Sequence, residues 1–196
     1  MNKPVRPPLT EPEEMRFGYE EFVRLGEARA FGEATQVELK GGKLVEMPSE
    51  GPVHLYVRSR LIDIFSLLRP KLPPGIAWLT DPTVRFSDDD VTIPDFTFGA
   101  PPTRNRPYSP SELRLVIEVG VTTARYDRTT KRTDYAAAGV PDYWLIEPAD
   151  APEDGLVRVH SALLSGEYGK VSVARAGDTL ALPFAPDLKI AVADFL

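Results

Sequence analysis

The spacing of apolar residues changes along the chain and marks the expected elements. Residues 19–27 predict a short helix, and residues 34–48 predict a β-hairpin that turns at Gly41 and Gly42, because glycine supplies the positive φ of a tight turn. A helix follows over residues 51–70 and ends near Pro70. Its apolar residues recur at spacings of three and four: Val53, Val57, Leu61, Ile64 and Leu68.

Short β-type runs follow residue 75, and the run over residues 113–119 is almost continuously apolar, as in a strand covered on both faces. A helical pattern over residues 124–139 ends at Gly139, and Pro141 prevents its continuation. A strand at residues 142–147 and a β-rich tail come next. The order predicts an α/β (α+β mixed) protein with a central mixed β-sheet flanked by helices and a β-rich C-terminal portion.

The length of 196 residues suits one domain, which we expect to span residues 15–196. The first 14 residues contain four prolines and predict a disordered or loosely attached arm.

Composition narrows the possible chemistry. The chain has no cysteine and only two histidines, His54 and His160, so oxygen ligands must hold most of any metal, which favours magnesium or manganese. No run approaches the ~18 to 20 apolar residues that cross a bilayer. We therefore expect a soluble, cytoplasmic protein without a membrane partner.

The charge is negative overall but unevenly placed. A net charge of −6 disfavours a protein coated in nucleic acid. Residues 104–132 nevertheless carry seven basic and three acidic residues. This segment forms either a basic patch on an acidic body or a solvated loop.

Two carboxylates interrupt β-type runs. Glu118 stands in the apolar strand "LRLVIEV", where burial is costly unless the charge is paired, protonated or bound to a cation. Asp95 follows Pro94 in a second run. Together they predict a divalent-cation site between neighbouring strands. Taken singly, Glu118 also fits a structural ion pair and Asp95 a turn aspartate.

Asp127 and Lys131 are four residues apart on one helical face. Such a pair is usually a surface salt bridge. Alternatively, Lys131 points back toward the carboxylates, where it stabilises charge on a phosphate or orients a water.

Pro94-Asp95 followed by Glu118-Val119-Gly120 resembles the PD-(D/E)XK nuclease pattern, although Gly120 stands where the usual lysine would be. Four stretches together, "VELKGGKLVEMP" with a later histidine, "LVIEV", "YDRTTK" and "DYAAAGVPDYWLIEP", resemble the Uma family of putative restriction endonucleases. In that family the lysine is carried by the following helix, and Lys131 stands at the matching position.

The resemblance implies a restriction-endonuclease-like core and metal-dependent cleavage of phosphodiester bonds, with Mg or Mn as cofactor. Asp95 and Glu118 would bind the metal, the Val119 carbonyl would complete the coordination, and Lys131 would sit beside the attacking water. The resemblance also covers four further positions. It implies that Asp127 orients Lys131, that either Glu38 or Glu46 is an additional acid, and that His54 is a helix-surface residue or a group behind the metal ligands. His160 is expected to be structural, and Arg125, Arg128 and Arg132 are candidate nucleic-acid contacts.

Three functions stay open on the sequence. The first is an active endonuclease, with DNA as the expected substrate, working as a homodimer that cuts both strands. The second is a non-catalytic nucleic-acid-binding or protein-interaction module that retains the fold. The third is a metal-dependent hydrolase of a small phosphate ester.

Overall fold

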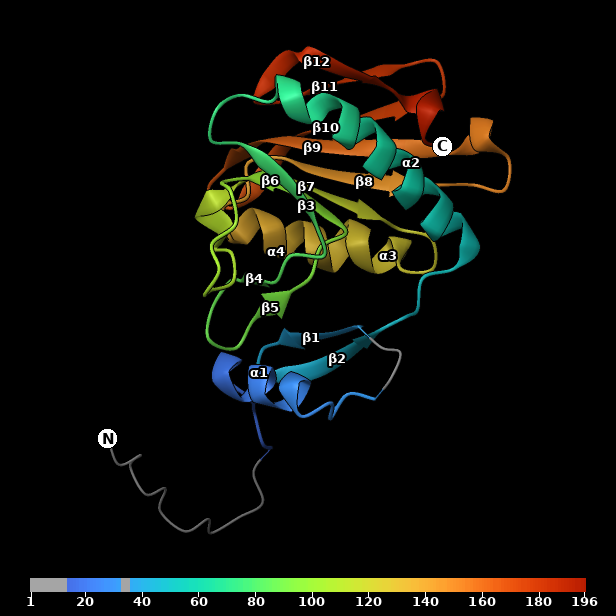
Figure 1. Cartoon of the computed structure of the whole chain (residues 1–196). Coiled ribbons are helices and arrows are strands. Elements are labelled where there is room, and N and C mark those ends of the chain that lie inside the picture. The colour runs from blue at the N-terminus through green and yellow to red at the C-terminus, as the bar shows by residue number, and fades with distance from the viewer. Residues whose placement is uncertain (1–13, 33–35) are drawn as a thin grey trace, which may run out of the picture.

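The computed structural model describes residues 14–32 and 36–196 (Figure 1). The arm expected over residues 1–14 lies outside this part of the chain, except for Glu14, whose carboxylate pairs with Lys43 at 2.7 Å. No helix in the described part combines the length and apolar character that crossing a membrane requires.

A six-stranded mixed sheet forms the centre of the molecule, in the order β10-β9-β8-β7-β6-β3. Its strands are β3 (Ala77–Thr80), β6 (Phe96–Gly99), β7 (Leu113–Val119), β8 (Tyr143–Glu147), β9 (Leu156–Leu164) and β10 (Glu167–Arg175). Only β7 and β8 pair in parallel, and the remaining neighbours are antiparallel. This parallel pair is joined by the crossover helix that the sequence predicts.

The two faces of the central sheet are covered by different elements. Helix α2 (Pro52–Leu68) packs on one face, together with the hairpin of β11 (Thr179–Leu182) and β12 (Ala185–Ala191). The opposite face carries the crossover, which is built from α3 (Ala124–Tyr126), a π-helical turn η3 (Asp127–Lys131) and α4 (Arg132–Ala137). The strands between them are therefore buried on both sides, as the apolar run in β7 predicts.

A second, four-stranded sheet in the order β2-β1-β5-β4 lies beside α1 (Tyr19–Glu27), below the crossover helices in the view of Figure 1. Its strands are β1 (Gln36–Lys40), β2 (Lys43–Met47), β4 (Val84–Arg85) and β5 (Val91–Thr92). Five 3₁₀ or π turns complete the described chain; besides η3 they are η1 (Arg69–Lys71), η2 (Pro110–Glu112), η4 (Pro152–Asp154) and η5 (Val192–Asp194).

The hairpin glycines have φ of 55° and 76°, as the tight turn requires. The stripe expected on α2 is shifted at its start, because Val53 is exposed and the inward stripe runs through Val57, Leu61 and Phe65. His54 takes the inward position of the first turn.

Candidate active site

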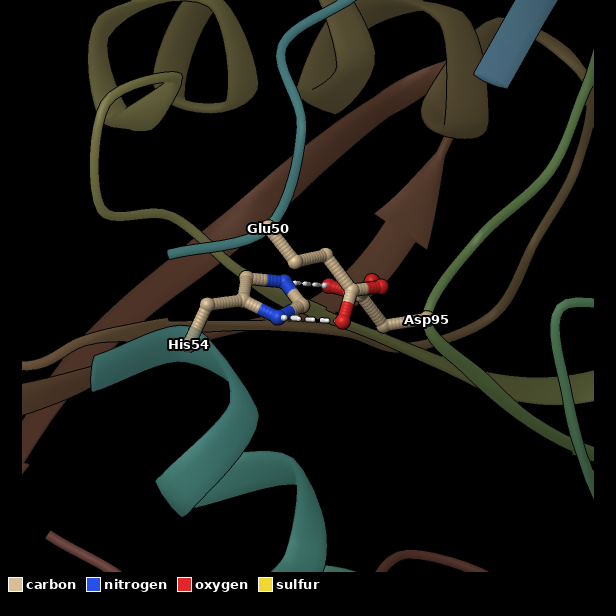
Figure 2. Close-up of side chains that lie close together, drawn as sticks. All are labelled: Glu50, His54 and Asp95. Atoms are coloured by element: carbon tan, nitrogen blue, oxygen red, sulfur yellow. Dashed lines mark hydrogen bonds and ion pairs between the residues drawn. The ribbon is translucent and has the colours of Figure 1, made fainter. Parts of the chain in front are cut away.

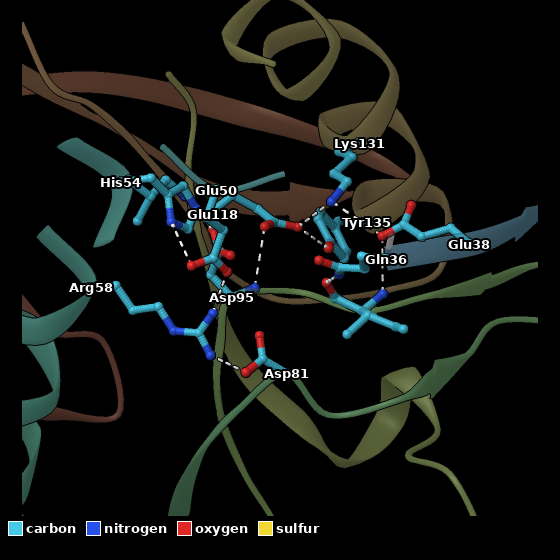
Figure 3. A network of polar contacts seen from close by, with 12 residues as sticks. Gln36, Glu38, Glu50, His54, Arg58, Asp81, Asp95, Glu118, Lys131 and Tyr135 are labelled. Carbon is cyan, nitrogen blue, oxygen red and sulfur yellow. Dashed lines mark hydrogen bonds and ion pairs between the residues drawn. The ribbon is translucent and has the colours of Figure 1, made fainter. Parts of the chain in front are cut away.

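Three elements bring the predicted carboxylates and lysine together (Figure 3). The register that pairs Phe96 with Ile117 carries Asp95, just before β6, alongside Glu118 near the end of β7. Lys131 reaches the same place from the last position of η3. All three residues line one cavity of about 130 Å³.

Asp95 and Glu118 are joined through backbone hydrogen bonds. The Asp95 N–H donates to Glu118 Oε2 at 3.2 Å, and the Val119 N–H donates to Asp95 Oδ2 at 2.7 Å. These bonds fix both carboxylates relative to the sheet. The side chains thus share a cavity floor that the two strands themselves hold rigid.

Glu118 is buried and heavily bonded. Its Oε1 accepts hydrogen bonds from Lys131 Nζ at 2.9 Å and from the Tyr135 hydroxyl at 2.6 Å. Burial raises the pKa of Glu118 to about 8, although the charge of Lys131 opposes the rise.

Asp95 behaves in the opposite way. Burial alone would raise its pKa, but His54, the Val119 N–H and the charge of Lys131 outweigh that effect, so the pKa of Asp95 lies below its usual value. Neighbouring carboxyls with pKa values pushed apart are typical of functional sites.

Lys131 is held between two carboxylates. Its Nζ lies 2.9 Å from Glu118 Oε1 and 3.3 Å from Glu38 Oε1. Burial would lower the pKa of Lys131, but the charges of Glu118, Glu38 and Asp127 raise it above the usual value. The side chain is therefore an ammonium at neutral pH, suited to stabilising negative charge rather than to accepting a proton.

The packing around Gly120 explains why the lysine is displaced from its usual place in the pattern. A Cβ at Gly120 would lie 2.9 Å from the Ala124 Cα, and 3.0 Å from both Asp127 Oδ2 and Leu145 Cδ1. A side chain at this position would overlap the crossover. The π turn, an uncommon element frequently found at functional sites, brings Lys131 to the carboxylates instead.

Glu38 and Glu46 lie on opposite faces of the hairpin, because Glu38 pairs with Val45 whereas Glu46 pairs with Val37. The buried Glu38 Oε1 accepts hydrogen bonds from Thr92 Oγ1 at 2.8 Å and from the Ile93 N–H at 3.0 Å. Glu46 is exposed and does not line the cavity. The expectation of Glu46 as an additional site acid was therefore wrong, since strand alternation turns it away.

His54 lies deeper in the site than a helix-surface position. Its Nε2 is 3.2 Å from Asp95 Oδ2 and its Nδ1 is 3.4 Å from Glu50 Oε2 (Figure 2). Burial would lower the pKa of His54, but the hydrogen bond and charge of Asp95, with the charge of Glu50, raise it above its usual value. One ligand atom from each of these three residues lies within 4.8 Å of the others.

Arg58, one turn after His54, bridges two acids. Its guanidinium pairs with Glu50 on one side and with Asp81 on the other. The Asp81 N–H in turn donates to the Asp95 carbonyl at 3.3 Å. The bridge thereby links the start of α2 to the chain segment that carries Asp95.

Asp127 does not form a direct ion pair with Lys131 among the contacts of the described residues. Its buried carboxyl accepts a hydrogen bond from the Thr123 side chain and acts on Lys131 only through its charge. Burial, the largest effect, raises the pKa of Asp127. The effect of Asp127 on Lys131 in the structure is therefore electrostatic.

The candidate nucleic-acid contacts Arg125, Arg128 and Arg132 are all exposed on the crossover. Arg128 also pairs with Glu147 at 3.1 Å, which offsets part of the local positive charge. His160 is buried and stacks on Tyr143 with ring centroids 5.5 Å apart, in agreement with a structural role.

Sequence reasoning missed Glu50, Arg58 and Tyr135. Tyr135 lies four residues after Lys131, and Arg58 lies four after His54, so helical spacing alone would have placed each beside a candidate. Glu50 precedes α2 and carries no local signal, because its role depends on His54 and Arg58 lying close in space.

Comparisons with known proteins identify the family and the fold. A family model described as a putative restriction endonuclease matches residues 19–193. The chain is also similar to the crystal structure of a putative nuclease belonging to DUF820 from Anabaena variabilis, with a TM-score of 0.66 and 18% sequence identity over 91% of this chain and 97% of that one. A comparison with curated proteins finds no match. The structural likeness shows a shared fold with a mixed central sheet.

Proposed function

The chain belongs to the Uma2 family of putative restriction endonucleases. We propose that it is a metal-dependent endonuclease that hydrolyses phosphodiester bonds of nucleic acid, with DNA as the expected substrate. The observation that carries the proposal is the group of Asp95, Glu118 and Lys131 around one cavity. Two buried carboxylates and an ammonium are costly to assemble and have little use in a purely structural role.

The residues present suit a magnesium or manganese ion. Asp95 and Glu118 offer hard carboxylate oxygens at the cavity floor, and Val119 lines the same cavity, with its carbonyl as the proposed third ligand. When bound, such an ion lowers the pKa of a coordinated water and neutralises charge on the phosphate.

Lys131 and Tyr135 supply the remaining positive and hydrogen-bonding character. Both donate to Glu118 Oε1 and so hold its carboxylate in one orientation. The Lys131 ammonium also lies at the cavity wall, where it would stabilise the negative charge that develops as the phosphorus is attacked.

The crossover helix gives the proposed route for the substrate. Arg125, Arg128 and Arg132 are exposed on the same element that carries Lys131, so phosphates that they bind would lie near the site. The described part of the chain forms one such site, and cutting both strands of a duplex would take two copies. A homodimer is therefore part of the proposal.

The test is cleavage of supercoiled plasmid, single-stranded DNA and RNA by the metal-stripped protein after Mg²⁺ or Mn²⁺ is restored. Asp95→Asn, Glu118→Gln and Lys131→Met should each abolish cleavage, because each removes a ligand or the ammonium while preserving approximate shape. Glu46→Gln is the matched control, since it neutralises an exposed acid on the other face of the hairpin and should cut like the wild type.

The competing functions give different results in the same assay. Salt-sensitive nucleic-acid binding without cleavage under any metal condition would favour a non-catalytic module. Hydrolysis of a small phosphodiester with no cleavage of polymers would favour a small-ester hydrolase. Either result would refute the endonuclease proposal.

A further inference from the structure

His54 presents each of its ring nitrogens to a different carboxylate. Nε2 lies 3.2 Å from Asp95 Oδ2 and Nδ1 lies 3.4 Å from Glu50 Oε2 (Figure 2), and all three residues line the same cavity. Nδ1 is buried and makes no aligned hydrogen bond with the described residues. The imidazole therefore stands between two carboxylates, one nearer to each ring nitrogen.

The fold holds this imidazole in place. His54 occupies the inward position of the first turn of α2, ahead of the buried Val57 and Leu61, and its side chain is only 11% exposed. Arg58 holds Glu50 from the far side and is itself tied to Asp81, whose backbone bonds to Asp95. Figure 3 shows the chain of contacts running from Arg58 through Glu50 and His54 to Asp95.

We propose that His54 Nε2 is a nitrogen ligand of the cation that Asp95 holds, and that Glu50 and Arg58 are positioning residues that orient the imidazole. The proposal rests on the metal site of the proposed function and adds the class of ion. With a nitrogen donor present, the site prefers Mn²⁺ and later transition metals such as Co²⁺ over Mg²⁺.

Two chemical arguments support this assignment. One imidazole gives a single nitrogen to one ion, and the other nitrogen commonly donates its proton to a carboxylate that fixes the ring. Here the nitrogen nearer Asp95 is Nε2 and the carboxylate nearer Nδ1 is Glu50. Magnesium prefers oxygen ligands and retains its waters, whereas imidazole suits transition metals, with affinity rising from Mn²⁺ toward Co²⁺ and Ni²⁺.

The direct test is pulsed electron paramagnetic resonance of Mn²⁺ bound to untagged protein, which detects coupling from a coordinated imidazole nitrogen. The chain has two histidines, so the source of a signal can be assigned. We expect nitrogen coupling in the wild type and in His160→Phe, and its loss in His54→Gln. Bound Mn²⁺ without nitrogen coupling, or coupling that survives in His54→Gln, would overturn the proposal.

Affinities measured by titration calorimetry test the preference and the positioning role. His54→Gln should weaken Co²⁺ binding by about 10-fold or more while changing Mg²⁺ binding much less. Glu50→Gln should keep the nitrogen coupling but weaken Co²⁺ binding by about 10-fold, as for other groups behind a metal ligand. An equal loss for both metals in His54→Gln, or unchanged Co²⁺ affinity in Glu50→Gln, would contradict these roles.

The readout separates this proposal from the nuclease proposal. Nitrogen coupling in a protein that cleaves no nucleic acid would support the ligand and refute the activity. Cleavage that depends on Asp95 and Glu118, with no nitrogen bound to Mn²⁺, would support the nuclease activity and refute the histidine ligand. A wild type that binds no Mn²⁺ would refute both.

Discussion

The close packing around Gly120 gives a quantitative test of the fold at the site. Gly120→Ala adds one methyl group that would approach the Ala124 Cα to 2.9 Å, together with Asp127 Oδ2 and Leu145 Cδ1 at 3.0 Å each. A backbone atom cannot move aside as the end of a flexible side chain can. We expect a loss of about 1 to 3 kcal/mol in the free energy of unfolding, the usual cost of overpacking.

Urea denaturation followed by circular dichroism measures this loss, and the slope m should stay unchanged. For a chain of this length that unfolds in one step, the loss corresponds to a fall of roughly 2 to 4 °C in Tm per kcal/mol. Gly26→Ala in α1 is the matched control, because among the described residues its Cβ would meet only the Phe31 ring, at 3.5 Å. It should stabilise the protein by about 0.5 to 1 kcal/mol.

The same packing predicts that the usual lysine of the pattern cannot be restored. Gly120→Lys combined with Lys131→Met should be less stable than Lys131→Met alone and should recover no cleavage. A Gly120→Ala protein as stable as the wild type, or cleavage recovered by Gly120→Lys, would show that the crossover does not exclude a side chain at this position.

Three further predictions concern buried charges. Burial raises the pKa of Glu118 to about 8, so below that pH a cation must displace a proton from this carboxyl. The affinity for Mn²⁺ should therefore rise between about pH 6 and pH 8, by up to about tenfold per pH unit. An affinity that does not change with pH would contradict the burial argument. Lys131→Met leaves the buried Glu38 carboxylate without the ammonium 3.3 Å away and removes a hydrogen-bond donor to Glu118. The change should cost about 3 to 5 kcal/mol in urea denaturation, and wild-type stability in this variant would refute the ion-pair argument. Burial, with the charges of two nearby arginines, lowers the pKa of His160 from 6.5 to about 4. The unfolded chain therefore binds the proton first, and the free energy of unfolding should fall as the pH drops from about 6.5 to about 4. His160→Phe should remove this pH dependence, and an unchanged dependence would assign it to other groups.

Local patterns in the sequence predicted the elements well. Paired glycines at 41 and 42 marked the hairpin turn, and the apolar run of β7 marked a strand buried on both faces. The isolated carboxylate in that strand led to Glu118, and antiparallel pairing of β6 with β7 then places Asp95 beside it. These features depend on residues that are close in the chain or on one strand pairing.

The remaining features depend on contacts that no local pattern encodes. The prediction that Val53 begins the inward stripe of α2 was wrong, because a histidine takes the inward position there and a polar residue does not contribute to an apolar pattern. The bridge through Arg58 joins segments 8 and 23 residues away, which only the folded chain brings together. The π turn had no signal either, since the periodicity of residues 124–139 resembles an ordinary helix.

The most direct test of the account compares cation binding with cleavage in the same preparation. Mn²⁺ is titrated into metal-stripped protein while plasmid nicking and metal binding are both measured, for the wild type and for Glu118→Gln. We expect nicking by the wild type to reach half of its maximum at the Mn²⁺ concentration that half-fills the site. Glu118→Gln should weaken binding and abolish nicking together. Nicking by Glu118→Gln at the wild-type rate, or nicking that does not follow occupancy of the site, would contradict this expectation.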